Sequence, residues 1–185
     1  FEDNWKGTIY KGQLVAPNKV SAIRYKEYLD EIGKVTSEVI ISAPDMREGE
    51  EDAFEIAEDK VKAFWKSRMD KYGTTEMYEK TVINSFKKQD TPEIIIVVDK
   101  LLTGFDAPRN TVLYLTRPLK EHTLLQAIAR VNRLCPGKDY GYIIDYFGNL
   151  ENLHNALETY SGDNTFDAED IEGTWTNIGD EIKKL

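Results

Sequence analysis

Cysteine and histidine are scarce in this sequence, and their scarcity removes several classes of functional site. Cys135 is the single cysteine, so an internal disulfide and a cysteine-based metal site are both excluded. The two histidines, His122 and His154, do not have the spacing of metal ligands, and we expect both to be structural. A lone thiol is compatible with a reducing, cytoplasmic location.

Long apolar runs and an excess of basic charge are also missing. No run approaches the roughly 20 apolar residues of a membrane helix, and no secretory signal is visible, so we expect no membrane partner. The net charge is −9, which argues against a freestanding electrostatic nucleic-acid binder. A narrow rim that contacts phosphates remains compatible with an acidic body.

The sequence lacks the elements with which a nucleotide-hydrolysing enzyme binds most of its nucleotide. It contains no G-x-x-x-x-G-K-[ST] phosphate loop and no acidic strand end of the Walker B type to hold Mg²⁺. No cluster of acidic residues with a lysine indicates a nuclease site. The chain opens at Phe1 without an initiator methionine, and we expect it to be a piece of a longer protein that supplies these elements.

Short apolar runs that alternate with helical patterns predict the fold class. Residues 94–98 are all β-branched, which suits a parallel strand buried on both faces. Other strand-length runs lie at 13–15, 39–41, 112–115 and 142–144, and helical patterns occupy 19–33 and 121–133. Strands that alternate with helices imply βαβ units, so we predict a three-layer α/β domain with a parallel sheet and helices on both faces.

Two segments depart from this alternation. Residues 45–90 are charged and without strand signals, and we interpret them as a helical insertion with helices at about 51–72 and 76–88 and a solvated acidic face. After residue 148 an amphipathic helix at 150–160 is followed by an acidic remainder. We therefore predict one domain over 1–148, and a linker with the start of a helical domain over 149–185.

The helical pattern at 121–133 places polar and apolar residues on opposite sides. At about 100° per residue, Gln126, Arg130 and Arg133 project away from an apolar stripe made by Leu124, Ile128 and Val131. A guanidinium is planar and permanently charged, and it suits phosphate oxygens or the charge on a phosphoryl group in transfer. The helix alone is equally consistent with an ordinary solvated polar face.

A second candidate segment follows the buried run at 94–98. Sites in open α/β sheets form outside the carboxyl ends of strands, so we expect the loop 101–108 to lie there. Gly104 permits close backbone approach, and Asp106 can accept hydrogen bonds from a ribose or hold an arginine. A tight turn with a capping aspartate is the alternative interpretation.

Together these segments resemble motifs of helicase superfamily 2. Gly104–Pro108 looks like motif V and Gln126–Arg133 looks like motif VI, in the order found in the second RecA-like motor domain. With Gly141–Tyr146 added, the sequence resembles most closely the motor (restriction, R) subunit of type I restriction-modification enzymes. Residues 15–25 and 41–45 are similar to motif IV and the next strand-loop of that family, so the resemblance covers roughly 10–160.

The resemblance implies roles for individual residues. Arg130 and Arg133 would reach the γ-phosphate of ATP as arginine fingers, with Gln126 beside them, while Gly104 and Asp106 would bind nucleotide and couple its state to DNA. The sequence departs from the broad pattern where Ala127, Ala129 and Val98 replace residues common in relatives. We do not expect Val98 to contact DNA. The weaker candidates for DNA binding are Lys100, Asn18 and Ser42.

The fold implied is a RecA-like sheet of the P-loop NTPase type, and the function implied is part of an ATP-dependent DNA translocase within a type I site-specific deoxyribonuclease. ATP and Mg²⁺ would act in the intact motor. The partners would be duplex DNA, the first RecA-like domain and nuclease domain of the same subunit, and the modification and specificity subunits. Another superfamily 2 DNA helicase and a catalytically silent RecA-like scaffold for protein contacts remain open as alternatives.

Overall fold

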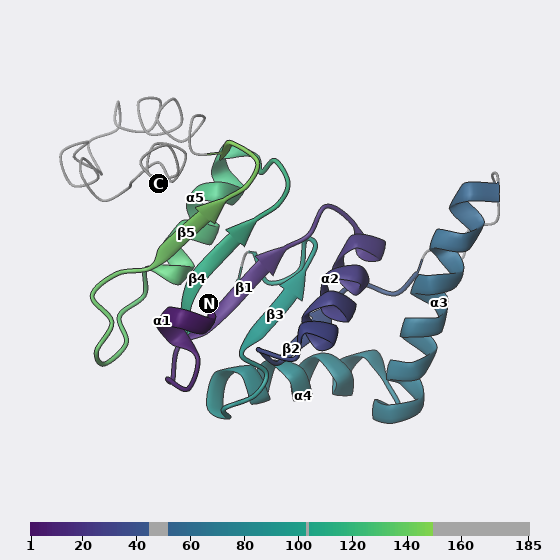
Figure 1. The fold of residues 1–185 in the computed structure, drawn as a ribbon, viewed down its shortest axis with the longest axis horizontal. Helices are drawn as coiled ribbons and strands as arrows, with labels where there is room; N and C mark the ends of the chain where they lie inside the picture. The colour runs from purple at the N-terminus through teal and green to yellow at the C-terminus, as the bar shows by residue number, and fades with distance from the viewer. Residues whose placement is uncertain (45–51, 103, 150–185) are drawn as a thin grey trace.

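Five parallel strands form one sheet at the centre of the molecule. The computed structural model describes residues 1–44, 52–102 and 104–149, within which the strand order is β2-β3-β1-β4-β5 (Figure 1). The strands are β1 (Lys11–Val15), β2 (Ser37–Ile40), β3 (Ile94–Val97), β4 (Asn110–Leu115) and β5 (Tyr142–Asp145). All neighbours pair in parallel, so the strands end together at one edge of the sheet, the carboxyl edge, and begin together at the amino edge.

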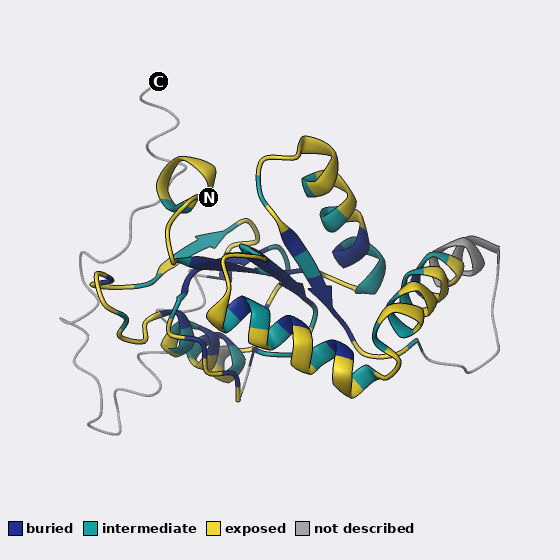
Figure 2. Cartoon of the chain, turned by 90° about the horizontal axis from the view of Figure 1, so that it is seen from below, coloured by how far each residue is buried: buried dark blue, intermediate teal, exposed yellow. Residues whose placement is uncertain are grey.

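Helices cover both faces of this sheet. Figure 2 shows α2 on one side of the buried strands and α4 and α5 on the other; we call these sides the α2 face and the α4–α5 face. The long helix α3 packs against both α2 and α4. The bounds are α1 (Glu2–Trp5), α2 (Lys19–Ile32), α3 (Asp52–Tyr72), α4 (Thr75–Lys88) and α5 (Glu121–Val131).

Each face has its own apolar cluster, because alternate side chains of a strand point to opposite faces. On the α4–α5 face, Tyr78 and Phe86 of α4 and Leu124 of α5 are fully buried against the strands. On the α2 face, Ala22 and Ile23 of α2 cover Val39 and Ile96. Burying one large apolar side chain contributes about 1.5–3 kcal/mol, so the two clusters hold all three layers together.

The predicted architecture, a three-layer parallel sheet with helices on both faces, is confirmed. The predicted strands and helices are present with small shifts of their ends, while α1 was not predicted. Segment 45–90 is more than an insertion, because α4 forms part of the connection from β2 to β3 and buries Tyr78, Val82 and Phe86 in the core. The predicted C-terminal helical appendage lies outside the described residues.

The connection from β3 to β4 decides where the candidate site forms. β1 lies between these two strands, so residues 98–109 must cross it, and their described part contains no helix. The loop lies on the α4–α5 face, where Leu102, Phe105 and Ala107 enter the core. The ring of Phe105 lies 6.0 Å from that of Phe86 on α4. A packed loop thus takes the place that a crossover helix usually occupies.

Candidate functional site

Arg130 lies in the last turn of α5 and is tied to the loop that crosses the sheet. Its Nη1 donates a hydrogen bond of 2.7 Å to the carbonyl oxygen of Phe105. The side chain is half-buried, and its Nε is buried with no hydrogen-bond partner among the described residues. The guanidinium therefore has a defined position and donors that the protein leaves unused, which differs from the freely solvated arginine of an ordinary amphipathic helix.

Arg133 is paired with Asp106 of the same loop. Its Nη1 donates to Oδ1 of Asp106, and the two side chains remain 43% and 60% exposed. The predicted helix ended at Arg133, but α5 ends at Val131, and Asn132 is its C-cap, with the N–H of Asn132 bonded to the carbonyl of Ile128. Arg133 thus follows the helix, and its pairing with Asp106 sets its direction.

The remaining predicted nucleotide residues flank this pair without contacting it. Gln126 is exposed one turn before Arg130 on α5, on the same side of the helix. Gly104 is exposed and has a φ of 68°, a left-handed conformation that favours glycine, and nothing lies within 4 Å of the position a Cβ would take. The structure therefore brings Asp106, Arg130 and Arg133 together, with Gln126 and Gly104 at the margins.

This cluster lies away from the carboxyl edge, which corrects the predicted location of the loop. Residues 98–101 do start at the carboxyl end of β3, but the loop then descends over the α4–α5 face. At the end of the loop, the carbonyl of Arg109 accepts a hydrogen bond of 2.7 Å from the N–H of Lys11, the first residue of β1. Asp106 and the arginines therefore lie toward the amino edge, because the loop must return there to begin β4.

The end of α5 is fastened to the amino edge by three residues, Asn132, Lys138 and Gly141, to which the sequence alone assigned no role. The Oδ1 of Asn132 accepts a hydrogen bond of 3.0 Å from the N–H of Gly141, which lies just before β5. A Cβ on Gly141 would lie 2.4 Å from the carbonyl oxygen of Val131, so only glycine permits this close approach. The buried ammonium of Lys138 contacts the same carbonyl at 3.0 Å. A lysine between glycine and aspartate looks like a surface turn, so no sequence signal marked it.

The predicted DNA residues lie at the carboxyl edge and are not brought together as a cluster. Asn18 is the N-cap of α2, and its side chain accepts a hydrogen bond of 2.8 Å from the N–H of Ser21. Lys100 forms an ion pair with Glu79 of α4, and Ser42 is exposed. Two of the three side chains thus have structural partners within the domain.

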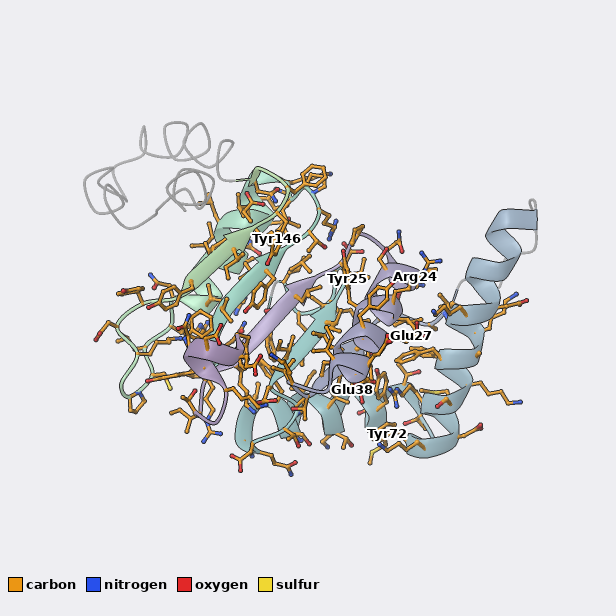
Figure 3. The ribbon with its side chains drawn as sticks, viewed as in Figure 1. Arg24, Tyr25, Glu27, Glu38, Tyr72 and Tyr146 are labelled. Atoms are coloured by element: carbon orange, nitrogen blue, oxygen red, sulfur yellow. The ribbon has the colours of Figure 1, made fainter. Side chains whose placement is uncertain are left out.

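Other polar side chains form hydrogen bonds between the segments at the carboxyl edge. Arg117 follows β4 and donates to the carbonyl of Val98 at 2.9 Å and to Oδ1 of Asp99 at 2.6 Å. Tyr25 of α2, labelled in Figure 3, donates to Oγ1 of Thr116 at 3.4 Å. Val98 is partly buried and packs against the apolar cluster of the α2 face.

The donor set at the arginine cluster suits an anion. Its free hydrogen-bonding groups are guanidinium N–H donors, and the carboxylate of Asp106 already accepts from Arg133. The cluster can therefore bind phosphate oxygens and stabilise negative charge.

Within the described ranges, no three His, Cys, Asp or Glu side chains are grouped so as to hold a metal ion. No described helix is long and apolar enough to cross a membrane.

Comparison with known proteins identifies relatives of the whole arrangement. Residues 13–148, more than half of the chain, match the family model "Type I restriction enzyme subunit R domain 3". The chain is 32% identical over 87% of its length to the type I restriction enzyme MjaVIIP endonuclease subunit of Methanocaldococcus jannaschii. It is 35% identical over 62% of its length to the HindI endonuclease subunit of Haemophilus influenzae.

The chain spans 15% and 12% of the lengths of these two relatives. Among solved structures, it is similar to LlaBIII, an ATP-dependent type ISP restriction-modification enzyme bound to DNA, with 18% identity over 83% of this chain and 10% of that one and a TM-score of 0.47. The family match covers the sheet, the crossing loop and α5. The chain therefore belongs to the family of type I restriction enzyme R subunits, within which it corresponds to domain 3.

Proposed function

We propose that this chain is one half of the ATP-driven DNA motor of a type I restriction enzyme, and that Arg130 and Arg133 act on the phosphates of ATP. The observation that carries the proposal is the anchoring of both guanidiniums to one loop, through the carbonyl of Phe105 and the carboxylate of Asp106. Each anchor uses only part of an arginine's five donors, so further Nη donors remain on both guanidiniums, while the Nε of Arg130 is buried.

The chemistry of the pair fits a transferring phosphoryl group. Negative charge develops on its oxygens in the transition state, and donors that are already oriented stabilise that charge without further reorganisation. Gln126 would lie beside the phosphates, while Gly104 and Asp106 would adjust the loop to the nucleotide state. The phosphate loop and the Mg²⁺ ligands would come from the first RecA-like domain of the same subunit.

The carboxyl edge would supply part of the track for duplex DNA, through Asn18, Ser42 and Lys100. Hydrolysis would open and close the two RecA-like domains and move the duplex, while the nuclease domain of the same subunit cleaves. The modification and specificity subunits complete the proposed complex in the cytoplasm. The similarity to endonuclease subunits of type I restriction enzymes supports this assembly.

Replacement of Arg133 by alanine in the full-length subunit tests the proposal. ATP turnover with linear duplex DNA should fall by about 10³–10⁵, the contribution typical of an arginine finger. The matched control is Lys66→Ala, which removes an exposed cation from α3. Turnover per folded molecule that stays normal in Arg133→Ala would contradict the proposal, because Arg133 would then take no part in ATP hydrolysis.

The alternative that the chain belongs to another superfamily 2 DNA helicase is tested by measuring DNA cleavage with the same full-length subunit. A type I enzyme should cut unmodified DNA in an ATP-dependent manner when the modification and specificity subunits are added. Arg133→Ala should abolish that cutting together with turnover. A full-length protein that turns over ATP on DNA but never cleaves with those subunits would instead indicate a helicase of another type.

A further inference from the structure

Lys138 is a buried lysine that no function assigned so far uses. Lys138 is 7% exposed, and its Nζ donates hydrogen bonds to three backbone carbonyls. The acceptors are Pro108 at 2.8 Å, Val131 at 3.0 Å and Asn110 at 3.1 Å. None of them is a carboxylate, so the ammonium is satisfied by dipoles alone, and burial lowers its pKa.

The three acceptors belong to two segments, which Lys138 joins in addition to their shared apolar cluster and the contacts of the arginines. Pro108 lies at the end of the loop that carries Asp106 and the carbonyl contacted by Arg130, and Asn110 is the first residue of β4, directly after that loop. Val131 is the last residue of α5, between Arg130 and Arg133 in sequence. Lys138 therefore fastens the loop to the arginine-bearing helix end on the core side, beneath the contacts that the arginines make at the surface.

A second buried contact fixes the other end of the loop. The side chain of Gln13 in β1 accepts a hydrogen bond of 2.9 Å from the side-chain amide of Asn110. It also donates a hydrogen bond of 3.3 Å to the carbonyl of Leu101. Leu101 has a φ of 66°, unusual for a residue other than glycine. Lys138 and Gln13 meet at Asn110, so one continuous polar path joins the start of the loop, its end and the end of α5.

We propose that Lys138 is a positioning residue that holds the loop of Asp106 against the arginine-bearing end of α5. This inference rests on the proposed function for its effect on ATP turnover, because the arginines must act on phosphate for their position to matter. Its geometric part, the fastening of the loop, stands on the contacts of Lys138 alone.

The chain contains a matched control at the amino edge. Lys11 is 1% exposed, and its Nζ donates to the carbonyls of Asp90 and Pro92, the latter at 3.0 Å. Burial lowers the pKa of Lys11 as it does that of Lys138. Lys11→Met therefore removes a comparable buried ammonium, but the carbonyls that it releases belong to the segment before β3 rather than to the loop or α5.

The experiment compares Lys138→Met with Lys11→Met in the full-length subunit. Amide hydrogen exchange should accelerate at residues 104–110 and 130–133 in Lys138→Met and not in Lys11→Met, with both variants held at the same fraction folded. ATP turnover should fall about 10- to 100-fold in Lys138→Met alone, since a displacement of about 1 Å costs that much in rate. The loss should appear in kcat with KM nearly unchanged, because the arginines act in the transition state.

Several results would overturn the proposal. Unchanged exchange in the loop would remove its geometric part, and a loss of turnover equal to that in Lys11→Met would show a role in stability only. If Lys138→Met does not fold, Lys138→Arg keeps the charge and moves the donors. It should loosen the loop and lower kcat partially, and wild-type values in both measurements would count against the idea.

The two proposals fail in different ways. If Arg133→Ala leaves turnover intact, the arginine-finger function is wrong, while the exchange comparison still decides whether Lys138 fastens the loop. If Arg133→Ala abolishes turnover and Lys138→Met does not change it, the motor function stands and the positioning role is wrong.

Discussion

The arginine cluster and the carboxyl edge both carry residues expected to bind phosphate-containing partners, yet they are built differently. In the cluster, residues from the crossing loop and from the end of α5 contact one another, through Arg130 with Phe105 and Arg133 with Asp106. At the carboxyl edge, Asn18 caps its own helix and Lys100 pairs with Glu79, so the candidate residues contact local partners instead of each other.

The difference shows what makes a preorganised site within one domain. The cluster is backed by a core contact of Phe105 and by the buried ammonium of Lys138, so its charged groups are held from below. The carboxyl edge has no equivalent backing for Ser42, an exposed residue. We infer that the arginine cluster is complete in its own geometry, whereas the proposed DNA track would need residues from the other domain of the proposed motor.

The sharpest way to break this comparison is to find activity in the arginine cluster alone. We predict that the isolated chain does not hydrolyse ATP, because its sequence contains no phosphate loop to bind most of the nucleotide. Phosphate release is measured with and without duplex DNA. Turnover that persists in a clean preparation and disappears in Arg133→Ala would show that the cluster suffices by itself.

The next largest effect concerns the packing beneath the cluster. Phe105→Ala should lower the free energy of unfolding by about 3–5 kcal/mol, since Phe105 is 4% exposed and its removal leaves a cavity beside Phe86. Tyr25→Phe at the carboxyl edge should cost less than about 1 kcal/mol, because its hydroxyl makes a single bond of 3.4 Å. Urea unfolding measures both, and equal losses would contradict the contrast between the two regions.

The smallest effect is expected in DNA binding. The isolated chain should bind duplex DNA without sequence preference and with a dissociation constant at or beyond the weak end of about 10⁻⁴–10⁻⁶ M, because its net charge is −9. Lys100→Ala should reduce the salt slope by about 1 at most, while Glu79→Gln, which releases Lys100, should strengthen binding slightly. Tight, sequence-selective binding that survives moderate salt would refute the motor assignment.

Much of the fold follows from local patterns along the chain. The β-branched run at 94–98 predicts β3 because such residues suit a strand buried on both faces, and Asn18 begins α2 because its side chain caps the first N–H groups. The position of Arg130 opposite the apolar stripe of α5 also follows from helical periodicity. These features depend on neighbours in sequence, which a pattern can report.

Only the tertiary structure decided how the site is assembled. The strand order places β1 between β3 and β4, so the loop 98–109 has to cross the α4–α5 face, and this crossing brings Asp106 to Arg133 near the amino edge. The same crossing buries Lys138, whose acceptors lie 7 to 30 positions away in sequence. By itself, the sequence determined the elements and the residue types of the site, because periodicity reports burial along one element. Contacts between elements depend on their order in space, which periodicity does not contain.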